Sequence, residues 1–191
     1  MIVWTFQPAS ILKEIERTGT FRCDPDRSFN LTKENDLKAS YAWLMDQMEK
    51  RIGPKPEGVA SPVWAWHTWD FERRCPDPDS GAFLESREPK AALTLDIPEK
   101  ELVLTDFDAW QLVMNGNYLS DVIGSEEEFE EQLSRLERLS EEELSKETEL
   151  SWQRVFNVEP LDSDSFTRGR YVQATFWEIR REYIKEIKLT L

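Results

Sequence analysis

The segment that most constrains the fold is VWAWHTW at residues 63–69, which holds three of the chain's eight tryptophans and its single histidine. In a strand, successive side chains point to opposite faces. One face then carries Val63, Ala65, His67 and Trp69, and the other carries Trp64, Trp66 and Thr68. Because large aromatic side chains fall on both faces, we expect this strand to be covered on both faces.

Further runs of apolar and β-branched residues predict other strands. They are IVWTF at 2–6, AALTLDI at 91–97, ELVLT at 101–105 and YVQATFWEI at 171–179. REYIKEIKLTL at the end of the chain is typical of a helical turn that leads into a last strand.

Helical spacing and capping residues separate these runs. We expect a short helix from Ile11 that stops at Gly19, and a longer one, capped by Thr32, that stops at Gly53. Three capping-box patterns predict further helix starts. They are Thr105 with Asp108, Ser125 with Glu128, and Ser140 with Glu143. The expected class is α+β: a single domain over residues 1–191, with a mixed, mostly antiparallel sheet, flanking helices and a Glu-rich helical insertion at about 125–156.

The charge is strongly negative and unevenly distributed. Lys and Arg total 24 against 38 acidic residues, a net charge of −14. Such a chain repels phosphate backbones, which excludes general nucleic-acid binding. Residues 125–149 carry eleven Glu against three basic residues, or −8, whereas residues 166–191 carry +3. The Glu-rich helices are either a solvated face or a surface for a protein partner.

No apolar run reaches the roughly 18 residues of a membrane span, and the first residues lack a signal-peptide pattern. We therefore expect a soluble, cytoplasmic protein without a membrane association. In that compartment Cys23 and Cys75 stay reduced.

Several catalytic classes lack their motifs. There is no GxSxG elbow and no Gly-rich phosphate loop. One His and two Cys fall short of a closed zinc site, so we expect no metal. DPDSG at 77–81 favours a turn, because its glycine is misplaced for a calcium loop that would end at Glu88.

Two polar residues among aromatics are candidate catalytic groups. His67 either packs among the tryptophans or orients a flat ligand that stacks on an indole. On a strand, Gln173 shares a face with Thr175 and Trp177, and Glu178 shares the other with Ala174 and Phe176. Glu178 either acts as an acid or base, or pairs with a nearby arginine such as Arg180.

The motifs WTFQP, SPVWAW, LTDFDAW and QATFWEI, in this order, resemble the bacterial proteins grouped as domain of unknown function 3841. The resemblance runs from Ile2 to about Ile187. It implies a bacterial cytosolic protein and no particular activity.

A more distant resemblance is to ADP-ribosyltransferases of the DarT type. It rests on VWTFQPASILKEIERTG near the start and on Gln173 and Ala174 near the end. It implies a fold that binds NAD, with Trp4 and Thr5 near the expected histidine. Thr175 stands at the position of the catalytic glutamate, and Glu178 is the candidate replacement.

Two functional hypotheses follow. The first is a pocket for a nucleotide such as NAD, with Glu178 and His67 as catalytic candidates. Its ligand-binding candidates are Trp4, Thr5, Arg22, Trp64, Trp66 and Gln173. The alternative is a non-enzymatic interaction protein that uses the acidic helical face.

Overall fold

The computed structural model describes residues 1–24, 26, 37–77, 89–120, 122, 126–163 and 167–190. The helix caps expected at Thr32 and Ser125, and the calcium-loop positions Gly81 and Glu88, lie outside this part of the chain.

A six-stranded sheet forms the centre of the fold, in the order β10-β4-β1-β3-β8-β5. Every neighbouring pair is antiparallel. The strands are β1 (Ile2–Pro8), β3 (Val63–Trp69), β4 (Lys90–Asp96), β5 (Val103–Asp106), β8 (Tyr171–Phe176) and β10 (Ile184–Thr190). The predicted α+β class is confirmed, and all the predicted strand segments contribute to this sheet.

Short elements connect these strands. Two small antiparallel pairs join β2 (Thr20–Phe21) to β9 (Ile179–Arg180) and β6 (Leu161–Asp162) to β7 (Thr167–Arg168). Short 3₁₀ turns are η4 (Glu99–Glu101), η5 (Trp152–Phe156) and η6 (Arg181–Tyr183). The last of these is the helical turn expected before the final strand.

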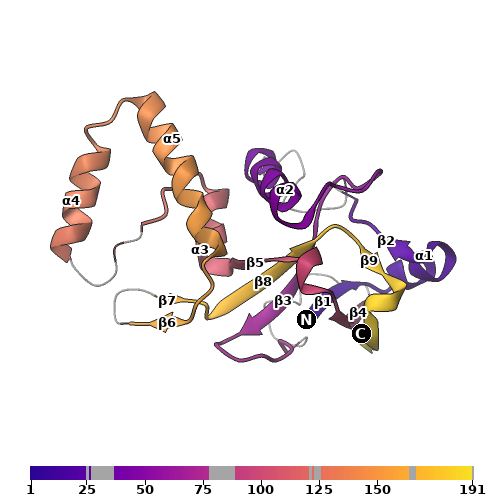
Figure 1. The fold of residues 1–191 in the computed structure, drawn as a ribbon. Helices are drawn as coiled ribbons and strands as arrows, with labels where there is room; N and C mark the ends of the chain where they lie inside the picture. Colours follow the sequence, from indigo (N-terminus) through magenta and orange to yellow (C-terminus); the bar gives the residue numbers. More distant parts are fainter. Residues whose placement is uncertain are drawn as a thin grey trace.

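Hydrophobic clusters lie on the two faces of the sheet and cover β3 from both sides, as the tryptophan pattern predicts. Helix α1 (Ile11–Thr18) packs its Ile11 and Ile15 with Val3 and Phe176 of the sheet. Helices α2 (Lys38–Ile52) and α3 (Phe107–Met114), with η5, form the second cluster. Figure 1 shows α2 above the sheet and α1 at its far end. Helix α2 ends at Gly53 as expected.

A β-bulge interrupts the alternation expected along β3. Trp66 lies opposite Gln173, but the next pair is Thr68 with Val172, so His67 is the extra residue. Such a bulge reverses the faces of the side chains that follow it. Trp69 therefore packs against Trp66, with ring centroids 4.8 Å apart. The expectation that Trp69 shares a face with Val63 was wrong.

The strand predicted over residues 171–179 ends at Phe176. The chain bends at Trp177 and resumes in β9, so the alternation that assigned Glu178 to the face of Ala174 does not extend to it. Phe176 belongs to the core cluster that contains Ile11 and Ile15, and Trp177 belongs to the cluster that contains Tyr41 and Trp110.

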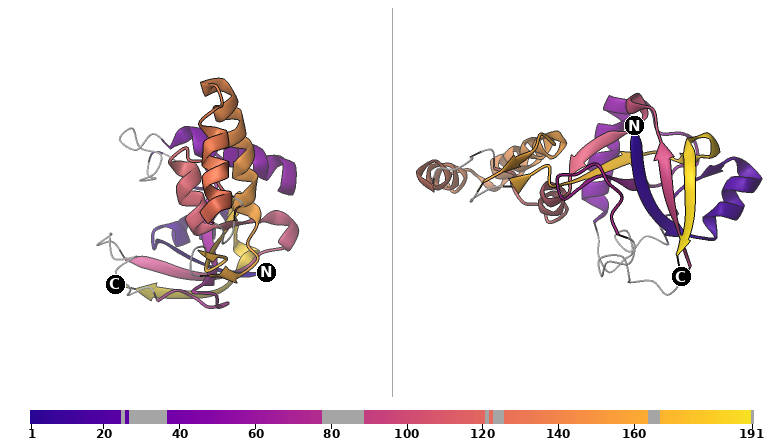
Figure 2. Two further views of the ribbon diagram at one scale, coloured as in Figure 1. Left: turned by 90° about the vertical axis from the view of Figure 1, so that its left-hand side faces the viewer. Right: turned by 90° about the horizontal axis from the view of Figure 1, so that it is seen from below.

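Helices α4 (Glu126–Leu136) and α5 (Glu141–Ser151) project from the sheet as an arm (Figures 1 and 2). The capping box of Ser140 and Glu143 is confirmed at the start of α5. The box predicted for Thr105 was wrong, because Thr105 belongs to β5 and Asp106 caps α3 instead. We call α4 and α5 together the arm.

Candidate functional site

Three of the predicted ligand-binding residues form a row on one face of the sheet. Trp4 of β1 lies opposite Trp66 of β3, which lies opposite Gln173 of β8. The Trp66 ring packs against Phe107 at 5.3 Å between centroids. The guanidinium of Arg73 lies over Trp4, 5.6 Å from the ring centroid. Side chains of the protein itself thus partly cover the two indoles in this row, which are half-buried.

Thr5 and Trp64 are joined by a hydrogen bond in the interior. The Thr5 hydroxyl donates to the Trp64 carbonyl at 2.8 Å and accepts from the Gln7 amide at 2.9 Å. The Trp64 ring packs against Tyr41 and Trp110. Its indole N–H is buried and has no acceptor among the described residues. These contacts make Thr5 and Trp64 parts of the core.

Glu178 and Arg22, both predicted as site residues, pair with each other. The Glu178 carboxylate accepts from Arg22 Nε at 2.9 Å and from Arg180 Nε at 3.0 Å. Burial raises the pKa of Glu178, but the hydrogen bonds and charges of the two guanidinium groups outweigh it and hold that pKa below its usual value. An ionised carboxylate with two cationic partners is a weak base, so this geometry favours a structural role.

The second guanidinium extends this cluster. Arg180 also donates to Glu101 of η4 at 3.2 Å, and the Tyr183 hydroxyl donates to the same carboxylate. Arg22 donates in addition to the carbonyl of Glu57 at 2.8 Å. The network therefore ties η4, β9, the segment after β2 and the loop before β3 together.

His67 lies apart from Glu178. Val63 is opposite Phe176 at one end of β3, whereas His67 is four residues further along, or roughly 13 Å at the rise of a strand. Its Nδ1 lies 2.9 Å from the Thr68 hydroxyl, and Arg73 donates to its carbonyl. The structure does not bring the two catalytic candidates together.

The environment of His67 predicts an unusual titration. Burial, followed by the positive charges of Arg73 and the N-terminus, lowers the pKa of His67 to about 4. As the only histidine, it gives a single imidazole signal in NMR. The imidazole should titrate near pH 4 and should therefore be neutral at pH 7.

This lowered pKa has a consequence for stability. The unfolded chain, with a histidine pKa of about 6.5, binds the proton first, so stability should fall as pH drops from about 6.5 toward 4. In a His67→Gln variant this pH dependence should disappear. A titration midpoint above pH 6 in the folded protein would contradict this environment.

A cavity with a volume of about 550 Å³ lies at the base of the arm. Its walls come from α3, α4, β7 and the segments around residues 118–120 and 154–157. Apolar side chains at the wall include Leu112, Tyr118 and Phe129, and charged ones include Asp108 and Arg168. None of these lining residues was among the predicted site residues, although Phe129 of α4 lies within the predicted Glu-rich helical insertion.

Asp106 holds one wall of this cavity in place. It is 3% exposed, and its carboxylate accepts from the amides of Ala109 at 2.9 Å and Gly169 at 2.6 Å. One side chain thus caps α3 and anchors the turn between β7 and β8. The motif LTDFDAW contained this residue, but only the fold shows its second partner.

A smaller cavity of about 260 Å³ lies beside Trp64, Tyr41 and Phe21. Pockets that bury a cofactor-sized ligand have volumes of about 300–1,000 Å³. Of the predicted ligand-binding residues, only Trp64 lines this cavity. It therefore gives the NAD hypothesis little support.

Within the described residues, no group of three His, Cys, Asp or Glu side chains is placed to hold a metal ion. Cys23 and Cys75 are free thiols, and burial raises the pKa of Cys23 to about 12. None of the helices in the described part has the length and apolar character needed to span a membrane.

The structure defines an α+β protein with an antiparallel sheet, a projecting acidic arm and a cavity between them. The family model of a domain of unknown function, DUF3841, matches residues 2–185, so the chain belongs to that family. Neither the curated proteins nor the solved structures include a match. The resemblance to DarT-type ADP-ribosyltransferases stays a prediction.

Proposed function

We propose that this chain is an interaction protein whose arm binds a basic, amphipathic segment of another protein. The observation that carries the proposal is the exposure of the apolar row on α4. Phe129 and Leu133 lie one turn apart in the row that ends at Leu136, and both are 44% exposed, whereas Leu136 is buried. An apolar row of this kind normally faces a core or a partner.

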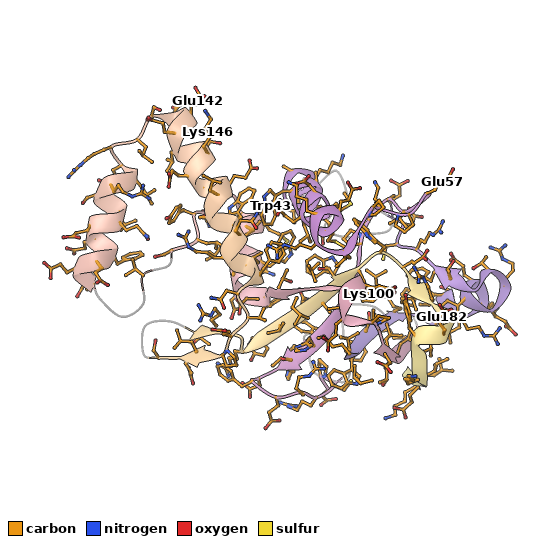
Figure 3. All side chains as sticks on the ribbon, viewed as in Figure 1. Trp43, Glu57, Lys100, Glu142, Lys146 and Glu182 are labelled. Atoms are coloured by element: carbon orange, nitrogen blue, oxygen red, sulfur yellow. The ribbon has the colours of Figure 1, made fainter. Side chains whose placement is uncertain are left out.

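The charge of the arm defines the chemistry of that partner. The first turns of α4 and α5 consist of Glu126–Glu128 and Glu141–Glu143. Ion pairs between described side chains of the arm join Arg135 to Glu147 at 3.2 Å and Lys146 to Glu142 at 2.6 Å. Figure 3 shows Glu142 and Lys146 near the end of α5 farthest from the sheet. The excess of glutamates favours lysines and arginines on the partner.

The cavity at the base of the arm supports the same function. Phe129 belongs both to the exposed row and to the cavity wall, and Leu112 on the facing helix α3 is also 44% exposed. Binding energy at protein interfaces concentrates where an apolar anchor fills a pocket and charged groups surround it. A partner helix could place one large apolar side chain in this cavity and its basic residues against the glutamates.

The nucleotide hypothesis receives less support from the geometry. Its two catalytic candidates lie apart, Glu178 is held by two arginines, and Arg73 and Phe107 pack against the indoles of Trp4 and Trp66. The interaction hypothesis needs only groups that are exposed.

A designed peptide tests the proposal. The probe is an amphipathic helix with leucines on one face and lysines on the other, and its control is a scrambled peptide of the same composition. Titration calorimetry should show binding of the amphipathic peptide that weakens with salt, because surface charges contribute. The double variant Phe129→Ser/Leu133→Ser should bind about 10- to 100-fold more weakly.

Leu189→Ser is the matched control variant, because this residue is 69% exposed and lies on β10, at the opposite edge of the sheet. It should bind as the wild type does. Circular dichroism establishes that each variant is folded. Equal binding of the scrambled peptide, or unchanged binding by the double variant, would refute a specific site on the arm.

A further inference from the structure

Strand β10 forms an open edge of the sheet. It pairs with β4 on one side, and no described strand pairs with its other side. All five residues from Lys185 to Leu189 are exposed, and Ile187 and Leu189 are 46% and 69% exposed. Figure 2 shows β10 beside β4.

An open edge offers unpaired backbone N–H and C=O groups to another strand. Many proteins protect such edges with lysines, bulges or short strands. In β10 the register shifts between Ile184 and Glu186, which leaves Lys185 out of the regular pairing. From Glu186 onward the strand is regular and continues beyond the exposed Ile187 and Leu189.

We propose that this edge joins two copies of the chain through an antiparallel β10–β10 pair, with the two-fold axis at Ile187. In this register, Glu186 of one copy lies opposite Lys188 of the other, and the two Ile187 residues face each other. Opposite side chains in an antiparallel pair have Cβ atoms about 4.5–5.5 Å apart, close enough for the charges and the apolar groups to interact.

The charge pattern selects this register. Residues opposite each other must lie on the same face, so the axis passes through a residue rather than between two. An axis at Glu186 would place two glutamates opposite each other, and an axis at Lys188 would place two lysines opposite each other. Only the axis at Ile187 pairs opposite charges. Within one chain, Glu186 and Lys188 form an ion pair of 3.4 Å, and the same pair of the second copy completes a cluster of four alternating charges.

This dimer is independent of the partner proposed for the arm. The arm packs near β5 and α3, whereas β10 is the opposite edge of the sheet. A pair of copies therefore leaves both arms accessible, and each proposal can fail without the other.

Charge exchange tests the register directly. In sedimentation velocity, the wild type should show a dimer whose fraction rises with concentration. Glu186→Lys alone or Lys188→Glu alone places like charges opposite each other, and each should weaken self-association at least 10-fold. Both side chains are exposed, so folding should be retained, and circular dichroism checks this.

Two combinations should restore association. The double variant E186K/K188E again places opposite charges across the pair. An equal mixture of the two single variants should form a heterodimer, because each supplies the charges that the other lacks. The proposal would be overturned if the wild type stays monomeric up to about 1 mM. At that concentration a weak dimer with a Kd near 1 mM is half formed. Self-association that is unchanged by either single substitution would also overturn it.

Discussion

Replacing Asp106 by alanine is expected to lower the free energy of unfolding by about 3 kcal/mol, the sum of a lost helix cap and a buried amide left without its acceptor. Asp106 is 3% exposed, and its carboxylate satisfies the backbone amides of Ala109 and Gly169. For a chain of this length, the midpoint of thermal unfolding should fall by roughly 6–12 °C. Calorimetry or urea titration gives the measurement.

Two neighbouring substitutions act as controls for Asp106. Asp106→Asn keeps one carbonyl oxygen, which can cap α3 or accept from the Gly169 amide, but it has no second oxygen for the other bond. The loss in free energy of unfolding should therefore be intermediate. Thr105→Val removes a buried hydroxyl that has no partner among the described residues and should be nearly neutral. A loss below about 1 kcal/mol for Asp106→Ala would show that the two amides find other acceptors.

Glu178→Gln is expected to lower the free energy of unfolding by about 2–3 kcal/mol at pH 7, since it removes a charge that is hydrogen-bonded to two arginines. The side chain is only 9% exposed, whereas those of Arg22 and Arg180 are 39% and 37% exposed. Water can therefore solvate the arginines in part, which keeps the expected loss below that of a fully buried pair.

The pH dependence of stability distinguishes the contribution of the Glu178 charge from that of side-chain packing. The pKa of Glu178 is lowered in the folded protein, so its contribution is present above the unfolded glutamate pKa of about 4.3 and is lost as pH falls through the lower, folded value. The difference between wild type and Glu178→Gln should therefore shrink as the solution is acidified below about pH 4. The exposed Glu182 provides the control, because Glu182→Gln should change stability little at either pH. A difference that is independent of pH would contradict the ion-pair network.

The sequence predicts the strands and several helix ends because these signals are local. Alternation identified β3, and Ser140 with Glu143 predicted the start of α5, since the capping contacts span three residues. The same reasoning failed for Thr105, because the adjacent Asp106 competes for the cap and has a better acceptor.

The candidate site was predicted less well than the fold. Trp4, Trp66 and Gln173 do share a face, which follows from alternation combined with the observed register. Arg22 and Glu178 do meet, as an ion pair between distant segments, and their roles in ligand binding stay predictions. The cavity at the base of the arm went unrecognised, because its walls come from segments as distant as Leu112 and Arg168.

By itself, the sequence determined the α+β class, the acidic arm and the burial of β3 on both faces, since composition, periodicity and caps act over a few residues. Only the tertiary structure decided that His67 occupies a bulge and that Glu178 pairs with Arg22, which lies 156 residues away. The physical reason is that strand register and buried charge pairing depend on which distant segments meet. That choice minimises the free energy of the whole chain, and no short window of the sequence contains it.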